Sequence, residues 1–206
     1  MVEREGVIKF DLQYKQTPAL TYSALRELNA WRTLLHRARL IGLDPSRYGG
    51  VGYGNISQRH KKTFVVSGTQ TQTRPLLTAQ HYSIVMECDP DINRIKARGP
   101  VAPSSEALTH GTVYDRDTRA RFVMHVHSPI IWRKAKSLGI PLTDKRAAFG
   151  TPEMAAEVER LFKKGVLRKR PIFAMGGHED GVVTFGRTGA EAGFLLLRTL
   201  VQAVRS

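Results

Sequence analysis

The sequence predicts a single α/β domain, and two observations support that fold class. Segments with apolar residues at helical spacing alternate with short runs of apolar and β-branched residues, as expected of a chain that packs helices on a sheet. The length of 206 residues and the apolar fraction of 41% suit one domain with a sizeable core. No internal repeat or low-complexity tract interrupts this alternation.

Helical segments are marked by their apolar spacing and by residues that favour helix starts. The spacing predicts helices at residues 21–42, 107–114, 129–138, 151–165 and 188–204. Ser104 and Ser105 suit the N-cap of the second helix, which places Glu106 in its first turn. Thr151 caps the fourth helix ahead of a proline. Thr188 opens the fifth helix as part of a capping box.

Short apolar runs predict the strands, at residues 63–66, 83–87, 94–97, 121–127, 171–175 and 181–185. The runs at 83–87 and 94–97 form a plausible hairpin, because the residues between them favour a turn. Residues 1–17 are mixed polar and are interpreted as an N-terminal arm of a domain that spans residues 1–206.

The composition limits the kinds of partner and of site. Cys88 is the only cysteine, so any metal must be held by histidine and carboxylate side chains. No apolar stretch resembles a leader or a membrane span, and we expect a cytoplasmic protein without membrane contact. The net charge of +14 attracts anionic ligands. Its basic residues are scattered, which makes nucleic acid an unfavoured partner that stays open as an alternative.

Three histidines are candidate metal ligands. His125 and His127 lie in one predicted strand, and two residues separated by one position point to the same face. A pair of this kind is common by chance, so a third ligand is needed to make a site. His178 lies in a glycine-rich bend between two predicted strands. Three histidine ligands leave an open position, which is typical of catalytic zinc.

Carboxylates near these histidines are candidate bases, and the sequence leaves the choice between them open. Glu106 precedes the histidine pair, and its simpler explanation is stabilisation of the helix dipole. Glu179 and Asp180 directly follow His178. His110 lies four residues after Glu106 on the same helical face, where it could pair with that carboxylate.

Two polar loops could approach a ligand. Residues 48–54 contain four glycines, which allow sharp bends and close contact. Residues 67–73 are rich in hydroxyl and amide groups that could bind an oxyanion. For this second loop, taken alone, an ordinary polar turn is the simpler interpretation.

Together these motifs resemble the class II aldolase/adducin family, over roughly residues 21–200. The order that carries the resemblance is Gly54-Asn55-Ile56-Ser57, Ser67-Gly68, Ser104-Ser105-Glu106, His125-Val126-His127 and His178. The resemblance implies a single-domain three-layer α/β/α fold with a central, mainly antiparallel sheet. It also implies a homotetramer with active sites at subunit interfaces.

The resemblance assigns roles to these residues. His125, His127 and His178 would hold a divalent metal ion, expected to be Zn²⁺, and Glu106 would be the catalytic acid or base. A substrate phosphate would bind at Asn55, Ser67, Gly68, Ser104 and Ser105. Such a protein would act in carbohydrate metabolism as a lyase, cleaving a small hydroxylated keto compound through a metal-stabilised enediolate. A sugar phosphate is the expected substrate.

Two departures bear on the reaction. Relatives commonly have glycine directly after the third histidine, whereas this chain places Glu179 and Asp180 there. The chain also ends without the tyrosine that one aldolase of the family uses as a proton donor, so Tyr53 and Tyr114 are alternative candidates for the general acid. Dehydration or epimerisation of a sugar phosphate is therefore an alternative to aldol cleavage. A noncatalytic polyanion-binding module is the alternative outside enzyme chemistry.

Overall fold

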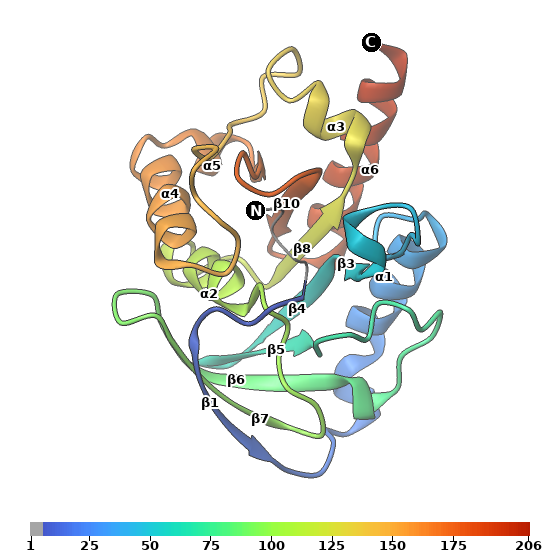
Figure 1. Cartoon of the computed structure of the whole chain (residues 1–206), viewed down its shortest axis with the longest axis vertical. Helices are drawn as coiled ribbons and strands as arrows, with labels where there is room; N and C mark the ends of the chain where they lie inside the picture. Colours follow the sequence, from blue (N-terminus) through green and yellow to red (C-terminus); the bar gives the residue numbers. More distant parts are fainter. Residues whose placement is uncertain (1–5) are drawn as a thin grey trace.

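An eight-stranded sheet runs through the centre of the computed structural model, and helices pack against both faces (Figure 1). The structure describes residues 6–206, apart from the side chains of Tyr22 and Ala24. The strands of the sheet are β1 (Asp11–Gln16), β4 (Asn55–His60), β5 (Thr63–Ser67), β6 (Tyr82–Asp89), β7 (Arg94–Gly99), β8 (Phe122–His127), β9 (Ile172–Ala174) and β10 (Gly181–Gly186).

The order of the strands is β1-β7-β6-β5-β4-β8-β10-β9. Every neighbouring pair is antiparallel except β1 with β7. Strands β2 (Gly42–Leu43) and β3 (Gly52–Tyr53) form a separate small ribbon. The predicted α/β fold with a mainly antiparallel central sheet is confirmed, including the hairpin of β6 and β7.

Helices cover the two faces of the sheet as separate layers. One face packs against α1 (Arg26–Arg37), α3 (Pro129–Arg133) and α6 (Gly189–Arg205). The other face packs against α2 (Ala107–Arg116), α4 (Pro152–Lys163) and α5 (Val166–Lys169). Short 3-10 turns lie at Tyr22–Leu25, Tyr48–Gly50 and Ala79–His81. No helix in the described part of the chain is long and apolar enough to cross a membrane.

Strand β8 sends alternate side chains into these two layers. Phe122, Met124 and Val126 pack in the core with α3 and α6, whereas Val123 packs in the core with α2 and α4. His125 and His127 have the same parity as Val123. Both imidazoles therefore lie on the α2 and α4 face of the sheet.

Several predicted elements have different bounds, and the helix expected over 129–138 ends at Arg133. The helix expected over 21–42 begins as a 3-10 turn and ends at Arg37, because Arg39 adopts a left-handed backbone with φ of 56°. Within the expected arm, Asp11–Gln16 forms an edge strand that pairs in parallel with β7. Residues 1–5 of that arm lie outside the described residues.

Helix starts follow the predicted capping residues with one correction. Thr151 accepts a hydrogen bond from the Met154 N–H, and Thr188 accepts one from the Glu191 N–H at 3.0 Å. Ser104 and Ser105, predicted for the N-cap of α2, lie before it, and Glu106, expected in the first turn, occupies the N-cap position. Its own N–H donates to Ser104 Oγ at 3.3 Å, so the serine orders the approach to the helix.

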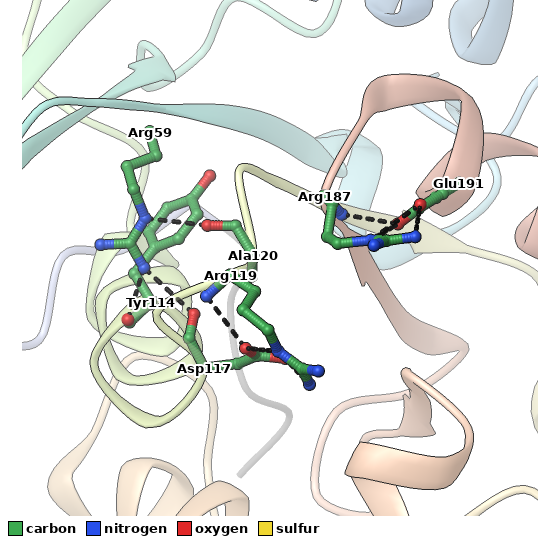
Figure 2. A network of polar contacts seen from close by, with 7 residues as sticks. All are labelled: Arg59, Tyr114, Asp117, Arg119, Ala120, Arg187 and Glu191. Atoms are coloured by element: carbon green, nitrogen blue, oxygen red, sulfur yellow. Dashed lines mark hydrogen bonds and ion pairs between the residues drawn. The ribbon is translucent and has the colours of Figure 1, made fainter.

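Arg59 of β4 fixes the far end of α2 (Figure 2). Its guanidinium donates to the carbonyl oxygens of Tyr114 (2.5 Å), Asp117 (3.2 Å) and Ala120 (2.8 Å). These contacts bind the turn between α2 and β8 to the sheet. Helix α2 is thus held at both ends, with Glu106 at the end near the histidines.

A loop over residues 142–150 packs directly against the turn that carries His178. Isolated bridges join Leu142 to Ala174 and Ala148 to Gly177. A Cβ atom on Gly177 would lie 2.1 Å from the Ala147 carbonyl oxygen, which is far inside van der Waals contact. Only glycine permits this approach of the two backbones.

The close contact at Gly177 makes its replacement costly. We expect Gly177→Ala to lower the free energy of unfolding by about 2 kcal/mol or more, because one of the two backbones must shift. Gly165→Ala is the matched control, since a Cβ atom there meets nothing within 4 Å and only the φ of +71° opposes it. Its cost should be about 1 kcal/mol. Urea unfolding measures both, and equal losses would contradict the steric argument.

Candidate metal centre and active site

Three histidines from two segments converge on one point. His125 and His127 come from β8, and His178 comes from the turn between β9 and β10. The Nε2 atoms of His127 and His178 are 3.1 Å apart. Potential ligand atoms of the three side chains all lie within 4.8 Å of one another. Each residue is at most 3% exposed, so the cluster is closed to bulk water.

Backbone hydrogen bonds hold the turn that brings in His178. The Met175 N–H donates to the Gly181 carbonyl at 2.8 Å, and the Gly181 N–H donates to the His178 carbonyl at 3.0 Å. Gly181 lies directly opposite His127 in the pairing of β10 with β8. A Cβ atom on Gly181 would come within 2.7 Å of the His178 ring. Because Gly181 has no side chain, it leaves room for the imidazoles.

Burial keeps the three imidazoles neutral, which is the form that binds metal ions. It lowers the pKa of His125 to about 3. Burial and then the neighbouring His178, His125 and Arg47 hold the pKa of His127 well below its usual value. For His178, burial is again the main cause of a lowered pKa, followed by His125 and Lys9. All three can therefore offer a nitrogen lone pair at neutral pH.

The donor set fits a divalent ion. His125 Nδ1 lies 3.2 Å from Asn55 Nδ2, while its buried Nε2 has no hydrogen-bond partner within the part of the chain that the structure describes. Such an atom costs free energy unless a ligand satisfies it. Nitrogens that share a tetrahedral zinc ion lie about 3.4 Å apart, because each Zn–N bond is about 2.0–2.1 Å long. The candidate ligand atoms lie within 4.8 Å of one another, so the rings would have to close by at most about 1.4 Å.

Glu106 is the carboxylate that lies against this cluster. Its Oε1 is 3.5 Å from His178 Nε2, and its Oε2 accepts a hydrogen bond from Thr109 Oγ1 at 3.2 Å. The side chain is buried, and α2 presents it on the same face of the sheet as the histidines. Among the three acidic candidates, Glu106 therefore has the geometry to move a proton beside an ion held here.

The two extra residues after His178 have different environments. Glu179 is exposed. Asp180 is 2% exposed and adopts a left-handed backbone with φ of 62°. Its carboxylate forms an ion pair with Arg47 and accepts a hydrogen bond from the Tyr48 hydroxyl at 2.8 Å. Asp180 thus contacts the segment before β3 through its Oδ2 atom.

Of the predicted phosphate residues, Asn55 contacts the histidine cluster, and the others lie on segments joined to its strand or to each other. Asn55 pairs with His125 across β4 and β8. Gly68 forms an isolated bridge with Pro103, which brings the end of β5 beside the chain that leads into α2. The residues brought to this edge are Asn55, Ser67, Gly68, Ser104 and Ser105.

Some polar groups of this set already have partners inside the chain. The Gly68 N–H donates to the His81 carbonyl at 2.9 Å, and Ser67 Oγ accepts from the Ile56 N–H at 3.2 Å. A serine hydroxyl that accepts one hydrogen bond still has its proton to donate. The serines therefore remain suitable donors for an anion, whereas the Gly68 N–H is committed to the fold.

The candidate general acids are placed differently. Tyr53 packs its ring 5.3 Å from that of His127, and its hydroxyl donates to the Arg39 carbonyl. Tyr114 lies behind the cluster, where its hydroxyl is 2.8 Å from Ser57 Oγ. His110 Nδ1 is also bonded to Ser57 Oγ, at 2.6 Å, and not to Glu106 as the helical spacing allowed.

Two aromatic rings, Tyr48 and Phe149, pack against the histidine cluster, and neither was a predicted site residue. Tyr48 lies 4.5 Å from the His127 ring in an edge contact, and Phe149 lies 4.6 Å from the His178 ring. Lys9 Nζ sits 3.7 Å above the Phe149 ring. Tyr48 belongs to the glycine-rich segment that the sequence marked as able to approach a ligand, whereas Phe149 and Lys9 carried no local signal.

Buried neutral histidines make stability depend on pH. Burial and the nearby His125 lower the pKa of His110 to about 3. Between about pH 6.5 and pH 3 the unfolded chain binds a proton at this residue and the folded chain does not. We therefore expect the metal-free protein to lose stability on acidification, by about 1.4 kcal/mol per pH unit for each such histidine.

Urea unfolding between pH 7.5 and pH 4.5, with chelator present, measures this dependence. His110→Gln should reduce the slope of the unfolding free energy against pH by about one proton, whatever its effect at neutral pH. A slope that His110→Gln does not alter would contradict the assignment of His110 as a buried neutral group.

Comparison with known proteins places this chain in a family. The sequence model described as the Class II Aldolase and Adducin N-terminal domain matches residues 43–204. A search of curated proteins found no match. Among solved structures, the fold resembles L-fuculose-1-phosphate aldolase from Thermus thermophilus, with 20% identity, a TM-score of 0.62 and coverage of 89% of this chain and 90% of that chain.

Two further structures share the fold. Sugar-phosphate aldolase from Thermotoga maritima has 13% identity and a TM-score of 0.63, with coverage of 89% of this chain and 94% of that one. The N-terminal class II aldolase domain of a conserved protein from Thermoplasma acidophilum has 18% identity and a TM-score of 0.60, with coverage of 90% and 94%. At these identities the structures show the fold, and the family match over most of the sequence shows that this chain belongs to the class II aldolase and adducin family.

Proposed function

We propose that this protein is a metal-dependent lyase that cleaves a carbon–carbon bond in a small hydroxylated keto compound, a sugar phosphate. The observation that carries the proposal is the buried cluster of His125, His127 and His178 with the Glu106 carboxylate 3.5 Å from His178. Neutral imidazoles and one nearby carboxylate are the groups that metal-assisted carbonyl chemistry requires. Membership of the class II aldolase and adducin family supports the same assignment, because the resemblance to that family implies a metal ion at these histidines.

In this proposal the three histidines hold a divalent ion, Zn²⁺ by preference because all three protein ligands are imidazoles. When bound, the ion supplies Lewis-acid polarisation of a substrate carbonyl. Glu106 takes a proton from the substrate hydroxyl and returns it to carbon after cleavage. Its position at the N-cap of α2, with Thr109 on its second oxygen, orients the carboxylate toward the cluster.

A phosphate group on the substrate would bind at the edge formed by Asn55, Ser67, Gly68, Ser104 and Ser105. Ser104 and Ser105 directly precede Glu106, so a phosphate held by their hydroxyls would place the substrate beside the proton-moving group. The names of two similar structures, an L-fuculose-1-phosphate aldolase and a sugar-phosphate aldolase, support a phosphorylated sugar as the substrate class. The net charge of +14 favours capture of an anion.

The protein is further proposed to act in the cytoplasm as a homotetramer, with residues 1–206 as one domain. Exposed apolar side chains on α6 support an assembly of copies. Phe194, Val201 and Val204 are 63%, 56% and 66% exposed, and all three lie on the outer side of this helix. Apolar side chains grouped in this way are typical of surfaces that a second chain covers.

The ion site can be tested by metal analysis of untagged protein. We expect about one Zn²⁺, Co²⁺ or Mn²⁺ ion per chain after reconstitution, and we expect His127→Ala to lose it because two imidazoles no longer suffice. His60→Ala is the control, since His60 is exposed at the end of β4. Failure of the wild-type protein to bind any divalent ion, with a folded spectrum, would refute the metal centre.

The reaction can be tested by a screen of phosphorylated and free keto sugars. We expect a cleavage activity whose kcat falls by about 10² to 10⁴ in Glu106→Gln, because the proton transfer loses its base. Glu179→Gln should leave kcat unchanged, since that carboxylate is exposed. Chromatography of the products separates cleavage from epimerisation or dehydration. Turnover that survives both Glu106→Gln and His127→Ala would show that the activity does not come from this site.

A further inference from the structure

Residues 44–50, called here the lid segment, lie over the histidine cluster. Within this segment the Tyr48 ring contacts the His127 ring edge-on, with centroids 4.5 Å apart and an angle of 77° between the planes. His127 is 2% exposed, while Pro45, Ser46 and Gly49 on the lid segment are exposed. The lid segment therefore separates an interior ion site from the surface.

The backbone of the lid segment is strained, and its backbone hydrogen bonds are local. Tyr48, Gly49 and Gly50 are three successive residues with positive φ, at 51°, 67° and 71°. A left-handed backbone is unfavourable for tyrosine and persists only where surrounding contacts impose it. The backbone hydrogen bonds donated by Arg47 and Gly50 stay within the segment. The strain must accordingly be balanced by side-chain contacts with the rest of the protein.

Asp180 supplies these contacts. Its buried carboxylate accepts a hydrogen bond from the Tyr48 hydroxyl at 2.8 Å and forms an ion pair with Arg47. On the other side, the Asp180 carbonyl accepts a hydrogen bond from the Ser128 N–H at 2.9 Å, directly after β8. One residue thus links the lid segment to the turn that carries His178.

Space beside the lid segment allows movement. A hollow next to it is lined by Arg39, Leu43, Asp44, Pro45 and Tyr53. Within the described residues, a Cβ atom on Gly49 would meet nothing within 4 Å. The segment is held to the interior by the contacts of Tyr48 and Arg47 with Asp180, while Pro45, Ser46 and Gly49 are exposed, which is the arrangement of a hinged cover.

We propose that Asp180 is a positioning residue that latches the lid segment, through Tyr48 and Arg47, over the ion site. Release of the latch opens the path by which the ion and a small ligand enter and leave. This inference rests on the proposed function, because the cover has a purpose only if the cluster holds an ion. The latch itself is a property of the metal-free chain and can be measured there.

Hydrogen exchange of the lid-segment amides in metal-free protein tests the latch directly. We expect Tyr48→Phe and Asp180→Asn each to speed exchange in residues 46–50 by between about tenfold and about a hundredfold, the range for losing a hydrogen bond to a charged group. Asparagine tolerates the left-handed backbone, so Asp180→Asn removes charge without adding strain. Glu179→Gln is the matched control and should exchange as wild type does.

A second measurement links the latch to the ion. Chelator-driven release of Co²⁺ should quicken in Tyr48→Phe and Asp180→Asn by a similar factor, while the cobalt absorption spectrum keeps its shape because the three ligands are intact. In the double variant the two effects should not add, because both substitutions break the same contact.

The outcomes separate the latch from the function it serves. Unchanged exchange at residues 46–50 in both variants overturns the latch, and so does an equal acceleration in the β6–β7 hairpin, which would mean general destabilisation. Protein that binds no cobalt refutes the proposed function, yet leaves the exchange experiment to decide the latch. Faster exchange with unchanged cobalt release would overturn the gating role of the lid segment.

Discussion

The register of β8 against its two neighbours is the constraint on which the candidate site depends. Antiparallel pairing places Asn55 of β4 beside His125, and Gly181 of β10 beside His127. Because side chains alternate along a strand, a shift of one residue would turn both imidazoles into the apolar layer under α3 and α6. The alternate apolar residues of β8 fill that layer, so the same core that stabilises the sheet also orients the ligands.

Burial of the histidine cluster lowers the free energy of unfolding, and this cost is consistent with a site that binds a ligand. Imidazoles lose hydration when they enter the interior, and a buried polar atom such as His125 Nε2, which has no partner among the described residues, costs about 1–3 kcal/mol. Replacing the cluster with apolar residues would remove that cost. Retaining it is consistent with a site where polar groups are kept ready for a ligand, as functional sites commonly trade stability for activity. The neutral state of the histidines follows from the same burial.

Part of this arrangement could be predicted from local sequence, and the remainder required contacts between distant segments. The period of a strand was sufficient to place His125 and His127 on one face. The N-caps at Thr151 and Thr188 were equally local. By contrast, strand β1 within the expected arm was not predicted, because its parallel pairing with β7 at the edge of the sheet leaves no local pattern. The resemblance to the family assigned Glu106 as the base, whereas the residues alone left the choice of carboxylate open. Only the folded structure shows that Glu106 is buried and that Glu179 is exposed.

Closure of the site follows from contacts made by segments far apart in the chain. Tyr48 packs on His127, and Phe149 packs on His178, so an ion between the histidines would sit in a low-dielectric space with little water. In the proposed reaction such a space would strengthen the interaction of Glu106 with developing charge, and the protein would have to open for each ligand. The extra residues after His178 place Asp180 where it can control that opening. Asp180 and His178 share one tight turn, so in the proposed site the latch on the lid segment and the third ligand of the ion depend on the same local structure.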